Sequence, residues 1–452
     1  MMFTPHTPQE IEEMLKVIGV DKIEDLFENV PEKHRFPELD LPEPLTEMEA
    51  ADELDYISSG NASTDEFISF LGAGAYNHYI PAAVDMLLRR GEFYTAYTPY
   101  QPEVSQGTLQ AIFEFQTLMT ELTGMDVSNA SHYDGATAAA EAANLAYHFF
   151  RGKRKNILVS RAVHPQYRET IRTYMQGLEN VVVLGDEDQA DMSTGLQQLT
   201  GKIDNNTALV VVQYPDFFGR VIDYTNLIKI AHTQGALVCM IFNPTALGLI
   251  KPPGDYDADI AVGDGQPLGI PLSFGGPYLG IFTCKKKYVR KLAGRLVGET
   301  VDEEGQRAYV LTLTAREQHI RREKSTSNIC TNQGLMALAA TIYLSLLGKD
   351  GFQQVANLCY QKAHYAADQL SNIDGFELAF PETPFFHEFV LRTPKPVNEI
   401  SDHLINHGIF PGYDLSEAYP EMNNHMLIAV TETLSREDIE FFAATLEEVA
   451  ND

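Results

Sequence analysis

Residues 91–107, here called the tyrosine loop, hold the densest group of side chains that could contact a ligand. Its candidate contact residues are Tyr94, Tyr97, Tyr100, Glu103 and Ser105. Phenol, carboxyl and hydroxyl groups supply hydrogen-bond donors and acceptors, and the prolines between them stiffen the chain. A rigid polar loop in front of a helix suits ligand contact. The same residues would equally suit a packed surface loop, and their spacing does not distinguish the two.

A second group of candidate residues opens an alanine-rich helix. It consists of Asp134, Gly135, Ala136 and Thr137. The first N–H groups of a helix have no partner within it, so small residues there could expose them to a phosphate. Any closely packed helix also favours small residues, however. His164 follows the next strand, where a single histidine is more often structural than catalytic.

Two further stretches could contact a ligand. The loop 264–277 follows an apolar strand and is rich in glycine and proline. Ligands of open α/β sheets bind at such strand ends. Residues 316–324 are the most basic stretch of the chain. They could form a helix face on which Glu317 and Arg321 pair, or a patch that binds an anion or another subunit.

The elements that must position these residues alternate between two periods. Short apolar, β-branched runs occur at 156–160, 181–184, 209–212, 237–242, 260–262 and 279–282. Helical patterns lie between or before them, as at 107–124, 165–177 and 224–235. Continuous apolar strands separated by helices indicate a buried, mostly parallel sheet covered on both faces. The sequence therefore predicts a three-layer α/β domain over residues 61–300.

The N-terminal residues 1–60 show a different pattern. Thr7, Pro8 and Glu10 form the start signal of a helix. From residue 31 to 54 prolines and acidic residues dominate, with too few apolar residues for a core. We expect an extended arm there, lying on a partner subunit. A loose tail is the alternative.

Residues 301–452 predict a smaller α+β domain. Helical patterns occur at 335–347, 352–370 and 435–449, and alternating segments occur at 386–392 and 426–430. Helices followed by strands in this order distinguish it from the preceding three-layer domain.

Composition narrows the class of protein. The 452-residue chain carries 33 basic and 63 acidic residues, a formal net charge of −30, which disfavours nucleic acid and anionic membranes as partners. Its four cysteines lack the spacing of a metal site, so no metal is expected. The chain shows neither a run of about twenty apolar residues nor the N-terminal pattern of a targeting segment. These features predict a soluble cytoplasmic protein that does not enter a membrane.

Four segments in one order resemble the glycine decarboxylase family, the P-protein of the glycine cleavage system. They are the tyrosine loop and residues 131–135, 314–324 and 327–331. The match extends from about residue 60 to 335, and the chain is similar to the first, or alpha, subunit of members that are split into two chains. The resemblance implies the aminotransferase-like fold of pyridoxal-phosphate enzymes, fold type I.

The resemblance also implies where a cofactor would bind. Catalytic members place a Schiff-base lysine where this chain has Gln266, and an acidic partner of the pyridinium nitrogen where it has Asn243. Glutamine cannot form an imine and asparagine carries no charge, so pyridoxal phosphate is expected on the partner beta subunit and not on this chain. A remnant cofactor pocket would contain Asp134, Gly135, Ala136, Thr137 and His164. The residues that complete the partner's active site would be Tyr94, Tyr97, Tyr100, Glu103 and Ser105.

The function so implied is that of a subunit of glycine dehydrogenase (aminomethyl-transferring, decarboxylating). In a heterotetramer of two alpha and two beta subunits, the enzyme would decarboxylate glycine and transfer the aminomethyl group to the lipoyl carrier H-protein. The isolated chain would be inactive. Two alternatives stay open: a self-sufficient pyridoxal-phosphate lyase or transferase with an unrecognised lysine, and a purely structural partner subunit.

Overall fold

The chain forms two compact units, Met1–Ala62 and Ser63–Asp452. The computed structural model describes residues 6–179, 181–185, 195–329 and 331–451. All residues predicted to form a site lie in the second unit, and each unit is described by itself.

The first unit opens with α1 (Pro8–Ile18). Thr7 caps this helix: its hydroxyl accepts a hydrogen bond from the backbone N–H of Glu10, whose carboxylate accepts one from the backbone N–H of Thr7 at 2.7 Å. Gly19 follows the helix with a φ of 88°, the left-handed conformation that favours glycine at a helix end. The predicted helix start is confirmed.

A second helix, α2 (Glu47–Ser58), occupies the end of the segment predicted to be extended. The prediction of an extended arm is therefore wrong from residue 47 onward. Thr46 and Glu49 form a capping box like that of α1, and the helix contains neither glycine nor proline. Local start signals and helix propensity thus outweigh the low apolar content of the segment. No residue of α1 or α2 is buried.

A seven-stranded sheet forms the centre of the second unit, in the order β2-β8-β7-β6-β5-β3-β4. The strands are β2 (Val127–Ser128), β3 (Asn156–Val159), β4 (Val182–Gly185), β5 (Thr207–Tyr214), β6 (Leu237–Phe242), β7 (Ile260–Asp264) and β8 (Gly280–Cys284). β3 to β7 pair in parallel, whereas β8 runs antiparallel to its neighbours β2 and β7. Each predicted strand overlaps an observed one, and the mostly parallel sheet is confirmed.

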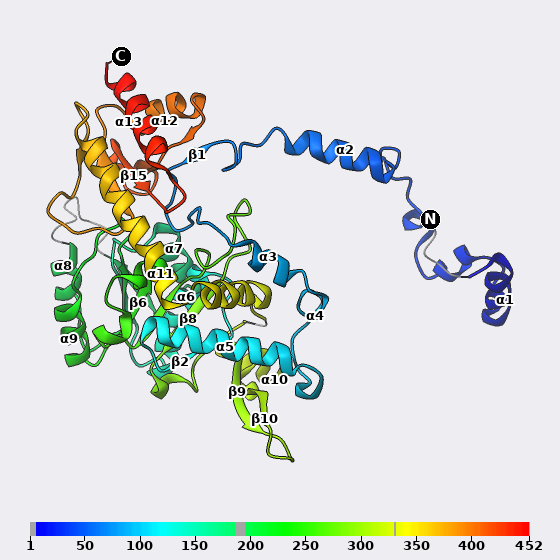
Figure 1. Cartoon of the computed structure of the whole chain (residues 1–452). Helices are drawn as coiled ribbons and strands as arrows, with labels where there is room; N and C mark the ends of the chain where they lie inside the picture. Colours follow the sequence, from blue (N-terminus) through cyan, green and yellow to red (C-terminus); the bar gives the residue numbers. More distant parts are fainter. Residues whose placement is uncertain (1–5, 180, 186–194, 330, 452) are drawn as a thin grey trace. The chain divides into compact units, whose positions relative to one another are not determined.

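Helices cover both faces of this sheet (Figure 1). Strand residues alternate between the faces: Ile157 and Val159 pack with the alanines of α6, whereas Leu158 packs with α9. The covering helices are α6 (Gly135–Phe149) and α7 (Pro165–Met175) on one face, and α5 (Gln106–Thr123), α8 (Gly195–Gly201) and α9 (Thr225–Thr233) on the other. This is the three-layer α/β arrangement that the sequence predicted.

The long helix α11 (Gly334–Ser371) joins this sheet to the C-terminal part of the unit. Gly348 interrupts the helix with a φ of 58°, so the two helices predicted at 335–347 and 352–370 meet at a kink. The first half of α11 packs with α5 and the second half packs with the C-terminal sheet. α11 is the one described helix whose length and hydropathy would suit a membrane span, and its packing in two cores accounts for its apolar character.

An antiparallel sheet, in the order β11-β12-β15-β14, forms the C-terminal part with α12 and α13. The bounds are β11 (Glu377–Leu378), β12 (Glu388–Arg392), β14 (Tyr413–Asp414), β15 (His425–Ala429), α12 (Val397–Asn406) and α13 (Arg436–Asn451). β1 (Ile68–Ser69), which lies within the predicted large domain of residues 61–300, pairs with β13 (Ile409–Phe410). The predicted boundary at residue 300 stays a prediction.

The basic stretch does not form the continuous helix that one alternative required. It follows the hairpin of β9 (Leu296–Val301) and β10 (Arg307–Thr312). A φ of 54° at Arg322 separates α10 (Gln318–Arg321) from a short 3-10 turn. The Arg316 guanidinium donates hydrogen bonds to three backbone carbonyl oxygens within residues 289–294. The Arg316 side chain therefore holds residues 289–294, which follow β8 of the large sheet, in place.

Candidate functional site

The predicted remnant of a cofactor pocket lies at the carboxyl ends of β5, β6 and β7. A cavity of about 40 Å³ opens there. That volume holds a few water molecules and is far below the ~300–1,000 Å³ of ordinary ligand pockets. The lining residues are Gly74, Tyr76, His164, Tyr167, Gln213, Ile241, Phe242, Asn243, Pro244 and Asp264. Two of the predicted residues, His164 and Asn243, thus face this cavity directly.

Gln266, at the predicted lysine position, is buried and fully hydrogen-bonded. Its Oε1 accepts a hydrogen bond from the backbone N–H of Tyr76 at 2.8 Å. Its Nε2 donates to the backbone carbonyl oxygens of Tyr76 at 2.8 Å and Ile270 at 2.9 Å. The amide therefore joins the loop after β7 to the segment after β1. A lysine could not accept the Tyr76 N–H, because an ammonium group has no acceptor.

Asn243, at the predicted acid position, follows β6 and also uses its whole amide. Its Oδ1 accepts hydrogen bonds from the backbone N–H groups of Thr245 at 2.9 Å and Ala246 at 3.3 Å. Its Nδ2 lies 3.2 Å from Nε2 of His387. Burial lowers the pKa of His387 to about 3, so this ring is neutral and can accept the amide proton. A carboxylate at this position would have no proton to donate to it.

The N-terminus of α6 is closed by two carboxylates of the chain itself. Asp134 caps the helix, with Oδ1 accepting a hydrogen bond from the backbone N–H of Thr137 at 2.7 Å. Asp264, the last residue of β7, accepts a hydrogen bond from the backbone N–H of Gly135 at 2.9 Å. A Cβ on Gly135 would lie only 2.1 Å from the Tyr167 hydroxyl, so the helix start is tightly packed.

Opposing effects act on the pKa of the Asp264 carboxyl. Burial raises its pKa to about 7, even though the backbone N–H groups of Gly135 and Gln266 donate to it and favour its charged form. The neighbouring charge of Asp134 also raises this pKa. Ala136, next to the N–H that Asp264 accepts, is half-buried. A phosphate approaching this helix end would therefore meet carboxylates where it needs open N–H groups.

His164 is the N-terminal cap of α7. Its Nδ1 accepts a hydrogen bond from the backbone N–H of Gln166 at 3.2 Å, and its Nε2 lies 2.8 Å from the carbonyl oxygen of Ala73, to which it donates. Burial lowers the pKa of the ring to about 4. Both ring nitrogens are thus engaged with backbone groups, and the imidazole is neutral at neutral pH.

Two polar residues beside the cavity, Tyr76 and Glu388, were not predicted as site residues. Glu388, in β12, accepts hydrogen bonds from the backbone N–H of Ala73 at 2.7 Å and from the hydroxyl of Tyr76 at 2.8 Å. Burial raises the pKa of Glu388 to about 7. The only signal in the sequence was a glutamate inside an apolar strand, because its partners lie more than 300 positions away.

These contacts do not fit pyridoxal phosphate. No lysine lies among the described residues that line the cavity. The amides of Gln266 and Asn243 are committed to structural partners, and Asp264 occupies the N–H of Gly135. The cavity of about 40 Å³ is also too small for a pyridine ring with its phosphate.

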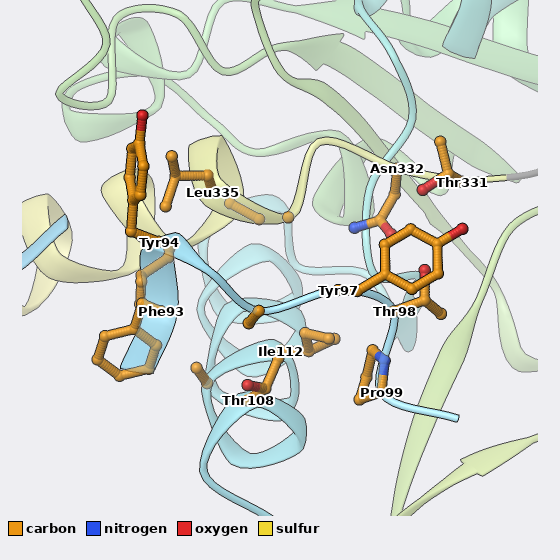
Figure 2. Close-up of a pocket in the computed structure, with 15 residues that line it drawn as sticks. Phe93, Tyr94, Tyr97, Thr98, Pro99, Thr108, Ile112, Thr331, Asn332 and Leu335 are labelled. Atoms are coloured by element: carbon orange, nitrogen blue, oxygen red, sulfur yellow. The ribbon is translucent and has the colours of Figure 1, made fainter. Parts of the chain in front are cut away.

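The tyrosine loop lines a larger cavity of about 190 Å³, shown in Figure 2. α3 (Ala82–Leu88) precedes the loop, whose first four residues form the short helix α4 (Gly91–Tyr94). Tyr94 and Leu335 lie on one side of the cavity and Tyr97 and Asn332 on the other, with Ile112 of α5 between them. Tyr97 is 82% exposed, so its ring is available to another molecule.

Tyr100, in contrast, is tied to the body of the unit. Its hydroxyl accepts a hydrogen bond from Nη2 of Arg295 at 3.1 Å, and the guanidinium carbon lies 5.5 Å from the ring centre. Nη1 of the buried Arg295 lies 3.4 Å from side-chain oxygens of both Thr331 and Asn332. Arg295 therefore joins the tyrosine loop to the segment that begins α11.

The end of the loop is held by Gln106 rather than by the two predicted residues beside it. Glu103 is exposed in a short 3-10 turn, and the half-buried Ser105 makes no side-chain capping bond to α5. Gln106 accepts a hydrogen bond from the backbone N–H of Tyr309 and donates one to its carbonyl oxygen, both at 2.9 Å. The loop is thus anchored to β10.

Matches to known proteins cover nearly the whole chain. The family model described as glycine cleavage system P-protein matches residues 1–446. Proteins of Desulforamulus reducens and Geobacillus kaustophilus, each named probable glycine dehydrogenase (decarboxylating) subunit 1, are 51% and 52% identical to this chain. The first match covers 99% of both chains and the second covers 98% of both.

Solved structures agree with this assignment. A crystal structure of glycine decarboxylase (P-protein) in inhibitor-bound form superposes with a TM-score of 0.89 at 42% identity, over 99% of this chain and 100% of that one. Glutamate decarboxylase of Lactobacillus brevis shares the fold alone, with a TM-score of 0.66 at 14% identity over 94% of this chain and 97% of that one. The predicted family resemblance and the fold type I class are confirmed. This chain belongs to the glycine cleavage system P-protein family.

Proposed function

We propose that this chain is subunit 1, the alpha subunit, of a glycine dehydrogenase (decarboxylating), and that its partner subunit carries the pyridoxal phosphate. The relatives and the P-protein structure support the first part. The observation that carries the second part is the Asp264 carboxylate, 2.9 Å from the backbone nitrogen of Gly135. This carboxylate occupies the helix N-terminus where a cofactor phosphate would bind.

The tyrosine loop is proposed to form a wall of the partner's active site. Tyr97 and Tyr94 of this loop are 82% and 69% exposed. Large aromatic side chains gain free energy when they are buried, so these rings favour contact with another molecule. The loop is nevertheless anchored through Tyr100 and Gln106. A loop that is both anchored and exposed loses little conformational entropy when it binds a second molecule. Its phenols and Glu103 would bind and orient glycine or the lipoyl arm of the H-protein.

The first unit is proposed to bind the partner subunit. It buries none of the residues of α1 or α2, yet it exposes apolar side chains such as Val17, Leu41, Met48 and Tyr56, each more than 70% exposed. Exposed apolar groups favour association with another surface. The proposed assembly contains two alpha and two beta subunits, and a cytoplasmic location stays part of the proposal.

The location of the cofactor can be tested directly. Purified alone, this chain should show no internal-aldimine absorbance at roughly 400 nm, the region of that chromophore. Borohydride reduction of the assembled enzyme, followed by peptide mass spectrometry, should place the phosphopyridoxyl group only on a lysine of the partner. A phosphopyridoxyl lysine in this chain would contradict the proposal and favour a self-sufficient enzyme.

The role of the tyrosine loop needs a separate test in the assembled enzyme. Tyr97→Ala and Glu103→Gln should lower kcat/KM at least about tenfold, because misplaced contacts at a reacting centre are costly. Tyr360→Ala removes a tyrosine that is 41% exposed outside the loop and serves as the control. Full turnover by both loop variants in an intact complex would leave only a structural role for this subunit.

A further inference from the structure

We propose that His403, His407 and Glu448 bind a divalent transition-metal ion, with Zn²⁺ as the best-suited member of the class. One ring nitrogen from each histidine and one carboxylate oxygen of Glu448 lie within 4.8 Å of one another. Two histidines and a glutamate are a ligand set of zinc sites with three protein ligands. The site is independent of the proposed function, because neither the cavity at the sheet nor the tyrosine loop involves these residues.

The two helices of the C-terminal part place the three ligands together. His403 lies in the last turn of α12 and His407 directly follows that helix, so the two side chains are one turn apart on one face. Their ring centres are 4.5 Å apart. α13 supplies Glu448 to the same face. Histidines one helical turn apart can hold the same zinc ion.

The hydrogen bonding of His407 presents one nitrogen to a metal. Its Nδ1 lies 2.9 Å from the backbone carbonyl oxygen of His403, so Nδ1 is the donor and Nε2 keeps its lone pair. Metal-bound histidines commonly donate their second nitrogen to a carbonyl in this way, which sets the ring orientation. The contact therefore prepares Nε2 of His407 as a ligand.

The spacing of His403 and Glu448 also suits a shared ion. Nε2 of His403 is buried and has no hydrogen-bond partner among the described residues. The nearest oxygen of Glu448 is 3.5 Å away, which is long for a hydrogen bond. Tetrahedral bonds of about 2.0–2.1 Å to zinc separate two ligand atoms by about 3.4 Å. The observed distance matches two atoms that face a common metal.

A bound ion would join the end of α12 to the end of α13. Lys395 already holds this end of α13 by donating a hydrogen bond to the carbonyl oxygen of Val449 at 2.9 Å. Glu448 is 63% exposed at its side chain, so the ion would keep water in its remaining coordination positions. The net charge of −30 raises the local concentration of cations at the surface.

The test uses the full chain, Zn²⁺ and isothermal titration calorimetry in a buffer that does not chelate zinc. The wild type should bind zinc saturably. The double variant His403→Ala/His407→Ala should lose affinity by a factor on the order of 100, since even second-shell changes cost 10–100-fold. Hydrogen exchange in α13 should slow on zinc addition in the wild type and not in the double variant.

Two controls separate metal coordination from charge and from helix stability. Glu448→Gln should weaken binding, whereas Glu447→Gln makes the same charge change one residue away and should not. Lys395→Met loosens the end of α13 but keeps all three ligands, so it should retain binding. Unchanged zinc affinity in the double histidine variant would overturn the proposal and place the ion elsewhere, for example at the buried group of His78, Cys359 and Glu432. Equal losses in the two glutamate variants would overturn it as well, because net charge would explain them.

Discussion

The backbone N–H of Gly135 donates a hydrogen bond to the carboxylate of Asp264 at 2.9 Å. Gly135 opens α6 and Asp264 ends β7, so the helix meets the sheet through a protonatable side chain. An anion bound at the helix start would have to displace this carboxylate. The protonation state of the carboxyl that closes the helix start therefore depends on pH.

Asp264→Asn should change how stability depends on pH. The folded pKa of about 7 is above the ~4 of an unfolded aspartate, so the folded chain keeps a proton that the unfolded chain loses between these values. The contribution of Asp264 to stability is full below pH ~4 and is lost as the pH rises toward 7. Relative to wild type, Asp264→Asn should gain on the order of 2–4 kcal/mol of unfolding free energy across this window. Urea denaturation at several pH values measures it, and parallel profiles would refute the assignment.

Gln266→Lys should not create a cofactor site. The lysine could donate to the carbonyl oxygens of Tyr76 and Ile270, but the backbone N–H of Tyr76 would lose its acceptor. An unsatisfied buried N–H costs about 1–3 kcal/mol, so thermal unfolding should occur at a lower temperature. Absorbance after incubation with pyridoxal phosphate should match the wild type. A stable aldimine in this variant would show that Asp264 and Asn243 do not exclude the cofactor.

Arg295→Met and Tyr100→Phe should act as one unit in the assembled enzyme. Each removes one partner of the 3.1 Å hydrogen bond that anchors the tyrosine loop. The effects of two residues in direct contact are not additive, so the double variant should lose little more kcat/KM than the worse single variant. Hydrogen exchange of residues 94–104 should rise in each. Fully additive losses would mean that the two side chains act separately.

Thr46→Ala should loosen α2 alone. The Thr46 hydroxyl accepts a hydrogen bond from the backbone N–H of Glu49 and donates one to its carboxylate. Loss of such a cap costs about 1 kcal/mol of helix stability. Hydrogen exchange should become faster in residues 47–58 and stay unchanged in α1. Thr7→Ala is the matched control, since it removes the same cap from α1.

Much of the fold could be predicted from local patterns. Continuous apolar runs identified the strands of the seven-stranded sheet, since burial on both faces requires apolar residues throughout. Helical periods identified α5, α6, α7 and α9, which cover it. Capping residues identified α1 through Thr7 and Glu10. The same signal at Thr46 and Glu49 starts α2, so the prediction of an extended chain, which rested on composition alone, was wrong there.

The sequence by itself determined the family and the two positions, Gln266 and Asn243, at which the chain lacks catalytic side chains. Only the tertiary structure decided what those amides do and what closes the pocket. Gly135 and Asp264 are 129 positions apart, Tyr100 and Arg295 are 195 apart, and Tyr76 and Glu388 are 312 apart. A buried polar group must find a partner among the groups that the fold brings beside it. Residue types limit the possible pairs, and the packing of distant segments selects the pairs that form.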